Sequence, residues 1–274
     1  QTTLLMAGLG TILFHLLTKL KVPAFLGSSF AFLGGYAAVA PMKDGAANVE
    51  MLPYACLGVA FAGLLYLILA LFIKIIGVSK VMKLFPPVVT GPIIIAIGLC
   101  LAPSALNNCA SCWPLAIIAL VIVIIFNIWG KGMFKIIPIL MGVVISYVVA
   151  LIMNAMGITN PDGSAILNFS SVSTANWIGL PPMQFAKFDV TAILVMAPIA
   201  IATMMEHVGD MSAISATVGE NFIEDPGLHR TLIGDGLATS LSALVGGPAN
   251  TTYGENTGVL ELSKVHDPKV IRIA

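Results

Sequence analysis

Seven stretches of mostly apolar residues, each near the length of a membrane-spanning helix, dominate this chain. A helix needs about 20 such residues to cross the apolar core of a bilayer. The chain is 58% hydrophobic and 9% charged, whereas soluble domains are about 45–50% apolar and about 25% charged. A soluble enzyme and a disordered chain are therefore excluded, and an all-α polytopic membrane protein is predicted. The stretches lie near residues 3–18, 52–77, 86–103, 114–130, 136–156, 190–216 and 229–246.

Two further segments, near residues 22–41 and 246–263, are apolar but rich in Gly, Pro, Ser and Thr. Their first halves are poor helices, because Gly and Pro break helices and the pair Thr251-Thr252 favours extended backbone. Unwound backbone at membrane depth is tolerated only where it is buried in protein or lines a cavity. Paired interrupted segments are typical of the central site of a transporter. We therefore predict two broken helices that meet at a substrate site.

The basic residues test whether both broken segments cross the membrane. With nine alternating crossings, 11 of the 13 basic residues fall on one side, and Lys43 and Lys187 fall on the other. This strong positive-inside asymmetry predicts that both segments cross and that the loop near 158–189 is external. The net charge of zero gives no indication of nucleic-acid binding.

Three acidic residues, Glu206, Asp210 and Glu255, lie inside apolar segments. Glu206 and Asp210 are four residues apart and share one helix face. A carboxyl that is buried without a cationic partner holds its proton more readily than one in water. This pattern predicts a proton-coupled carrier, although helix-to-helix hydrogen bonding is an alternative role.

Other polar residues in or near the apolar segments are given structural roles. His207 is expected to be a packed histidine rather than a metal ligand, and Asp235 is expected near the cytoplasmic end of its helix. Cys109-Ala-Ser-Cys112 has the spacing of a redox or metal motif, but no second such pair or nearby histidine completes a zinc site. We interpret it as a short loop, and no metal or cofactor is expected.

The chain resembles the nucleobase–ascorbate transporter (nucleobase:cation symporter-2) family, and within it most the bacterial uracil permeases. The motifs that carry the resemblance are Pro23–Phe32, Glu206-His207-Val208-Gly209, Asp225–Arg230 and Asn250–Val259. The resemblance implies an inverted-repeat fold of seven plus seven segments, with core and gate domains and short antiparallel strands in segments three and ten. It also implies a multi-pass protein of the inner (plasma) membrane that is embedded in the lipid bilayer and forms a homodimer.

The resemblance also implies how the chain divides. Residues 1–85 would be core segments two to four, 86–157 gate segments five to seven, and 158–189 an external loop. Residues 190–274 would be core segments eight to ten and the start of eleven. Segments one and twelve to fourteen of the family would then lie outside this chain.

The family's functional residues map onto named positions here. Glu206 and Glu255 would hold the base, Gly254 would offer backbone contact, and Phe30 would stack on the ring, with Tyr253 beside them. Proton coupling would involve Asp210, Glu206, Glu255 and Ser29.

Two positions disagree about the substrate. Uracil permeases carry a histidine at the position of Asp210, where purine-selective relatives more often have aspartate. Those purine relatives commonly have glutamine at the position of Glu255. Because Glu255 would touch the base directly, we give it more weight and predict uracil as the substrate. The predicted protein is a proton-coupled symporter that imports uracil by alternating access. A xanthine or urate permease is the alternative within the family. Two remote alternatives are a channel and an intramembrane aspartyl protease that uses Asp210. We do not expect the protein to be an enzyme.

Overall fold

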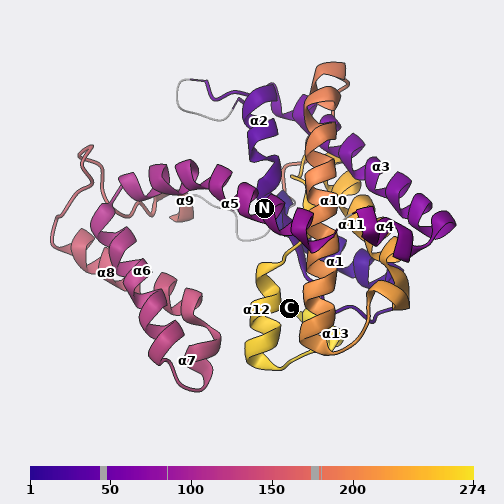
Figure 1. Ribbon diagram of the computed structural model, residues 1–274. Coiled ribbons are helices and arrows are strands. Elements are labelled where there is room, and N and C mark those ends of the chain that lie inside the picture. The colour runs from indigo at the N-terminus through magenta and orange to yellow at the C-terminus, as the bar shows by residue number, and fades with distance from the viewer. Residues whose placement is uncertain (44–47, 85, 174–178, 180) are drawn as a thin grey trace. The chain divides into compact units, whose positions relative to one another are not determined.

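The computed structural model describes residues 1–43, 48–84, 86–173, 179 and 181–274, and it is mostly helical (Figure 1). Two short strands are present, β1 (Leu26–Ser28) and β2 (Asn250–Thr252). The chain divides into two compact units, residues 1–97 with 181–274, and residues 98–180. The helices are α1 (Thr2–Leu17), η1 (Phe30–Phe32), α2 (Leu33–Val39), α3 (Leu52–Ile76), α4 (Val78–Leu84), α5 (Pro87–Ala110), α6 (Trp113–Trp129), α7 (Met133–Ile136), α8 (Pro138–Ala155), α9 (Ser170–Ser173), α10 (Val190–Val218), η2 (Ile223–Gly227), α11 (Leu228–Leu244), α12 (Glu255–Ser263) and α13 (Pro268–Ile273).

The seven apolar stretches expected from the sequence are all helical, as α1, α3, α5, α6, α8, α10 and α11. Within the described residues, four helices are long and apolar enough to cross a membrane, and shorter apolar helices accompany them. Several apolar helices in a mostly helical chain fit a polytopic membrane protein. The number of crossings stays a prediction.

Local sequence signals explain where the longest helix begins and ends. Asp189 precedes α10, and its carboxylate accepts hydrogen bonds from the backbone N–H groups of Thr191 and Ala192. This is the preferred N-cap arrangement. The helix ends at Gly219, whose φ of 83° is a left-handed conformation that favours glycine. The 29 residues between them hold Glu206 and Asp210 on one rigid element.

The core of the larger unit is built where α3 packs against α10 and α11, and where α1 packs against α11. Close backbone approach makes this packing possible. A Cβ added to Gly63 on α3 would lie 2.6 Å from the carbonyl oxygen of Gly236 on α11. Small residues of this kind are typical of helix contacts inside membranes. The rings of Phe14 and Tyr66 fill the space beside the contact and are fully buried.

The two segments predicted to be broken do contain short strands, and these strands pair with each other. β1 and β2 are antiparallel, with Gly27 opposite Thr251 at the centre. Each strand is followed by a helix start, η1 after β1 and α12 after β2. The structure therefore confirms the interrupted helices and their pairing, whereas the inverted repeat of the family stays a prediction.

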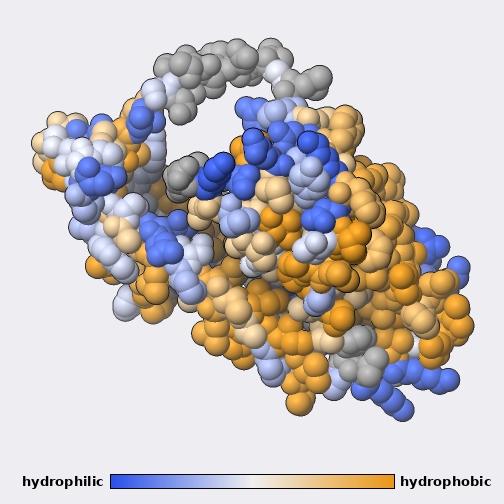
Figure 2. Space-filling model, turned by 90° about the horizontal axis from the view of Figure 1, so that it is seen from above, coloured by the Kyte–Doolittle hydropathy of each residue, from blue (hydrophilic) through white to orange (hydrophobic). Residues whose placement is uncertain are grey.

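The surface of the larger unit carries many large apolar side chains. On α3, Leu71 is 57% exposed and Ile75 is 73% exposed. Figure 2 shows apolar residues over much of the visible surface of this unit. Apolar patches of such extent are rare on soluble monomers and indicate a surface that contacts lipid or other protein.

In the smaller unit, α6 packs against α8. A Cβ added to Gly142 on α8 would lie 2.5 Å from Val123 on α6, so the helices are in close contact. The predicted core segments at 1–85 and 190–274, the gate segments at 86–157 and the external loop at 158–189 remain predictions. Residue 85 and parts of the predicted external loop, 174–178 and 180, lie outside the described residues.

Candidate functional site

The crossing of β1 and β2 organises the candidate site. The backbone ladder continues at both ends, where Tyr253 N–H donates to the Phe25 carbonyl and Ser29 N–H donates to the Ala249 carbonyl, each at 2.9 Å. Because the strands are antiparallel, Phe30 and Gly254 follow opposite ends of this ladder. Two helix N-termini thus lie at opposite ends of the crossing.

Helix α10 lies against both of these helix starts. It packs on η1 and α2 on one side of the crossing and on β2 and α12 on the other. Asp210 is 8% exposed, and a Cβ added to Gly254 would lie 2.4 Å from its Oδ1. Glu206 is half-buried one turn earlier on the same helix. The structure therefore brings Asp210 to the helix start that carries Gly254.

The remaining predicted residues differ in how they are placed. Phe30 is 54% exposed, and Ser29 is half-buried at the end of the ladder. The Tyr253 hydroxyl donates to the Ser28 carbonyl at 3.0 Å and lies 3.1 Å from the Ser28 hydroxyl. The backbone of Glu255 opens α12, and its side chain lies outside the part that the structure describes.

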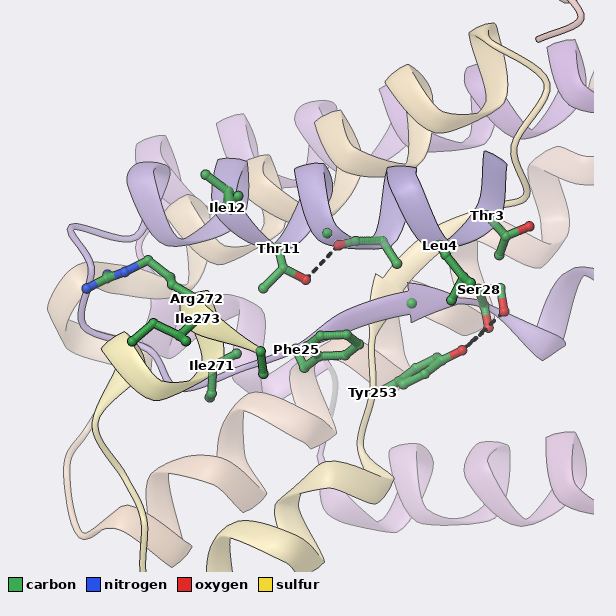
Figure 3. Close-up of a pocket in the computed structure, with 14 residues that line it drawn as sticks. Thr3, Leu4, Thr11, Ile12, Phe25, Ser28, Tyr253, Ile271, Arg272 and Ile273 are labelled. Carbon is green, nitrogen blue, oxygen red and sulfur yellow. Dashed lines mark hydrogen bonds between the residues drawn. The ribbon is translucent and has the colours of Figure 1, made fainter. Parts of the chain in front are cut away.

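A pocket of about 450 Å³ lies beside the crossing, between α1, β1 and the residues of α13 (Figure 3). The rings of Phe25 and Tyr253 line it, with their centroids 6.4 Å apart. Its described lining includes Tyr253 but neither Glu206 nor Asp210. Because the predicted carboxylates do not line it, we do not place the substrate there.

The outward-facing edges of the strands are bonded by side chains of the neighbouring helices. On β1, Leu26 N–H donates to the hydroxyl of Thr11 on α1 at 3.0 Å. On β2, the hydroxyl of Thr239 on α11 donates to the Asn250 carbonyl at 2.8 Å. Asn250 in turn donates from its side chain to the carbonyl of Met6 on α1 at 2.8 Å. Such bonds are required because a strand edge at membrane depth has no water to satisfy it.

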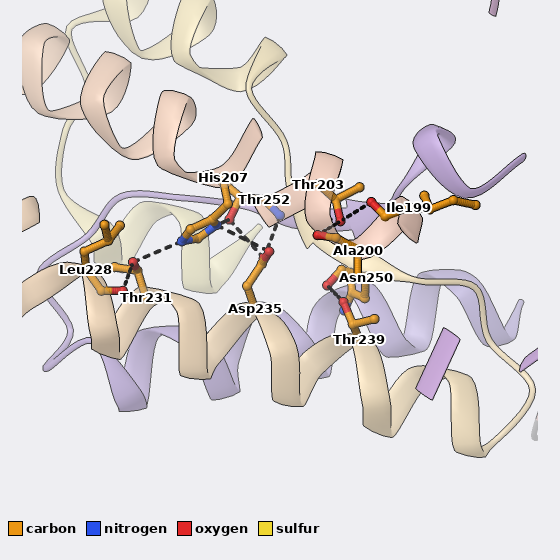
Figure 4. A network of polar contacts seen from close by, with 10 residues as sticks. All are labelled: Ile199, Ala200, Thr203, His207, Leu228, Thr231, Asp235, Thr239, Asn250 and Thr252. Carbon is orange, nitrogen blue, oxygen red and sulfur yellow. Dashed lines mark hydrogen bonds and ion pairs between the residues drawn. The ribbon is translucent and has the colours of Figure 1, made fainter. Parts of the chain in front are cut away.

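Asp235 on α11 serves the same edge of β2 and connects it to α10 (Figure 4). Its Oδ1 accepts from the backbone N–H of Thr252 at 2.8 Å and from the Thr252 hydroxyl at 3.1 Å. Its Oδ2 lies 3.3 Å from Nδ1 of His207, and both side chains are almost completely buried. The His207 ring also packs edge-on against Phe14 and Tyr66.

Both ring nitrogens of His207 have polar neighbours. The Thr231 hydroxyl donates to the Leu228 carbonyl, so it accepts from His207 Nε2 at 3.0 Å. Nδ1 of His207 lies 3.2 Å from the Thr252 hydroxyl and 3.3 Å from Asp235 Oδ2. The network therefore connects β2, α10 and α11 through buried polar groups.

The prediction for Asp235 is therefore wrong, whereas that for His207 as a packed histidine agrees with the structure. Asp235 is not at a helix end, because α11 begins at Leu228 and Asp235 lies two turns inside it. A sequence signal existed: Thr231, Asp235 and Thr239 recur every four residues and form a polar stripe on one helix face. Among the residues that the structure describes, no group of three His, Cys, Asp or Glu could hold a metal.

Comparisons with known proteins place this architecture in context. The sequence model of the Permease family (Xan_ur_permease) matches residues 1–274. The chain is 39% identical over 280 residues to the probable uracil permease of Haemophilus influenzae, covering 99% of this chain and 63% of that protein. It is 40% identical over 283 residues to the uracil permease of Bacillus caldolyticus, covering 98% of this chain and 61% of that protein. It is 35% identical over 273 residues to the putative pyrimidine permease RutG of Escherichia coli, covering 98% of this chain and 60% of that protein. The chain thus spans less than two thirds of the length of these relatives.

Proposed function

This chain belongs to the permease family, and on that premise we propose that the protein imports uracil as a proton-coupled nucleobase symporter. The family and these relatives are permeases, which argues against the intramembrane protease considered above. The relatives whose names state a substrate are permeases for uracil or pyrimidines.

The observation that carries the proposal is the crossing of β1 and β2 beside α10. Helix α10 contacts the helix starts at both ends of this crossing and carries the buried Asp210. Uracil is a flat ring with two N–H donors and two carbonyl acceptors. Carboxylates of Glu206 and Glu255 would accept from the ring N–H groups, backbone N–H groups at the helix starts would donate to its carbonyls, and Phe30 would stack on its face.

We propose that Asp210 takes part in proton coupling together with Glu206, Glu255 and Ser29, and that Tyr253 supports the binding segment. Transport would proceed by alternating access, with a core domain moving against a gate domain built from inverted repeats. In this arrangement the nine segments of the chain cross the inner membrane, and two copies of the protein form a dimer.

A xanthine or urate permease is the second candidate, and Asp210 is the observation that favours it. Its carboxylate lies against the backbone of Gly254, so a change of residue here would alter the immediate neighbourhood of the proposed base site. Glu255 favours the pyrimidine because a carboxylate accepts two N–H donors, whereas an amide offers one acceptor and one donor group.

The proposal is tested by proton-gradient-driven uptake of labelled uracil by the full-length parent, with xanthine as competitor. We expect saturable uracil uptake that xanthine does not inhibit, loss of uptake in Glu255→Gln, and altered pH dependence in Asp210→His. The matched control is Glu261→Gln on the same helix, whose exposed carboxylate pairs with Lys264 at 2.5 Å. Uptake of xanthine in place of uracil would move the protein to the purine branch. Equal loss in Glu261→Gln would show that Glu255 has no special role.

A further inference from the structure

Two cysteines lie at the tight connection between α5 and α6. Cys109 is in the last turn of α5, and Cys112 precedes the first residue of α6. The backbone N–H of Cys112 donates to the carbonyl of Cys109 at 3.1 Å. The hydroxyl of Ser111 donates to the carbonyl of Asn108 at 2.7 Å, which holds the same turn from its other side. The connection is therefore a closed four-residue turn.

This turn sets the spacing of the two cysteines. A four-residue turn closed by such a bond keeps its first and last Cα atoms within about 7 Å of each other. Disulfides bridge Cα atoms that are about 4.4–6.8 Å apart. The backbone of the turn thus already holds Cys109 and Cys112 at a separation that a disulfide can bridge.

Both cysteines also line one pocket of about 360 Å³, together with Leu115 and Asn160. Each of them is partly exposed. Asn160 lies in the loop after α8, where its side chain donates to the hydroxyl of Ser164 at 3.0 Å. The two cysteines are therefore accessible and share one cavity, unlike the buried Cys56.

The charge pattern assigns this turn to the external side of the membrane. Lys80 and Lys83 precede α5, and Lys131 and Lys135 follow α6, while residues 104–112 contain neither Lys nor Arg. If both helices cross, the lysines mark the cytoplasmic ends and the turn faces outward. Disulfides persist in external and periplasmic compartments, whereas cytosolic thiols are kept reduced.

We propose that Cys109 and Cys112 form a disulfide bond in the intact protein, which ties the end of α5 to the start of α6. One thiolate attacks the disulfide of an external thiol–disulfide oxidoreductase and forms a mixed disulfide. The second cysteine then attacks this bond, forms the Cys109–Cys112 bond and releases the oxidoreductase in its dithiol form. Two electrons pass to the oxidoreductase. The proposal depends on the orientation of α5 and α6 and not on the identity of the substrate.

The test counts thiols in the full-length protein, expressed in a bacterial host with an oxidising periplasm. Free thiols are blocked with N-ethylmaleimide at harvest, the protein is denatured, and a maleimide mass tag is added with or without prior reduction. We expect reduction to add two tags in the wild type and in the Cys56→Ser/Cys100→Ser double variant. We expect no such addition in the Cys109→Ser/Cys112→Ser double variant, which keeps every other cysteine.

The side of the membrane is tested on spheroplasts with a membrane-impermeant reductant. Reduction from outside should free the two thiols of Cys109 and Cys112 for tagging without lysis of the spheroplasts. The proposal is overturned if reduction adds no tags in the wild type, if the two tags remain in the Cys109→Ser/Cys112→Ser variant, or if they appear only after lysis. Uracil uptake is measured separately, so a failure of this proposal is distinguishable from a failure of the transport function.

Discussion

Replacing Asp235 by alanine is the perturbation whose cost the structure defines best. The carboxylate accepts two hydrogen bonds from Thr252 and faces His207, and all of this is buried. Removing one partner of a buried, hydrogen-bonded pair costs about 3–5 kcal/mol of unfolding free energy. Within that figure, an unsatisfied N–H of Thr252 accounts for about 1–3 kcal/mol.

Asp235→Asn is the informative partner of this variant. The asparagine carbonyl would still accept from Thr252, and its amide group would donate to His207 Nδ1, so a neutral imidazole satisfies every bond. We therefore expect a cost of about 1 kcal/mol, the size of one weakened hydrogen bond. The contrast between alanine and asparagine separates the loss of hydrogen bonding from the loss of negative charge.

The measurement is chemical unfolding of the full-length protein in detergent micelles, followed by tryptophan fluorescence. Asp162→Ala serves as control, because this loop carboxylate is solvent-exposed and accepts hydrogen bonds from the backbone N–H and the hydroxyl of Ser164, two residues further along the chain. An Asp235→Ala variant within about 1 kcal/mol of wild type would contradict the network as a stabilising element. An Asn variant as unstable as the Ala variant would show that the charge, and not the hydrogen bonding, is required.

Two further predictions follow from single contacts. Gly254→Ala is expected to lose most uracil uptake, because the added Cβ would lie 2.4 Å from Asp210 Oδ1. The control Gly258→Ala should transport normally, because a Cβ added there has nothing within 4 Å. Initial uptake rates at the wild-type level in Gly254→Ala would contradict the proposed packing. The hydrogen bond from Lys21 lowers the pKa of Asp225 in the folded protein below its usual value. The contact between Lys21 and Asp225 therefore stabilises the folded state at pH values above the usual pKa of an aspartate, and this stabilisation disappears as the pH falls through the lower pKa of the folded state. Acid titration of thermal stability should show this loss in the wild type but not in Asp225→Asn, and high salt should reduce it.

The positions of the helices could be predicted from the sequence because a bilayer imposes length and apolarity on every crossing. The broken segments could also be located, since Gly, Pro and β-branched residues mark unwound backbone. The register of the strands could not, because three-residue strands show no periodicity that would fix Leu26 opposite Thr252. Only tertiary packing, with Thr11 on one side and Asp235 on the other, selects that pairing.

The same packing explains why Asp235 lies inside α11 and not at its end. The prediction rested on the position of Asp235 early in the apolar stretch, where the helix dipole favours an anion. The neighbour of α11 is a strand, and its outward N–H and C=O groups need partners that an apolar helix cannot offer. The polar stripe on α11 supplies them through Thr239 and Asp235.

Polar residues in the apolar segments of this chain therefore fall into two groups with different roles. Thr11, Thr239 and Asp235 bond the outer edges of the ladder and are needed wherever two strands cross inside a membrane protein. Glu206 is half-buried and lies one turn before the buried Asp210 on α10. Acidic residues inside membrane-spanning segments are by default candidates for a ligand or proton site. Uptake measurements on Glu206 therefore test function, whereas unfolding measurements on Asp235 test architecture.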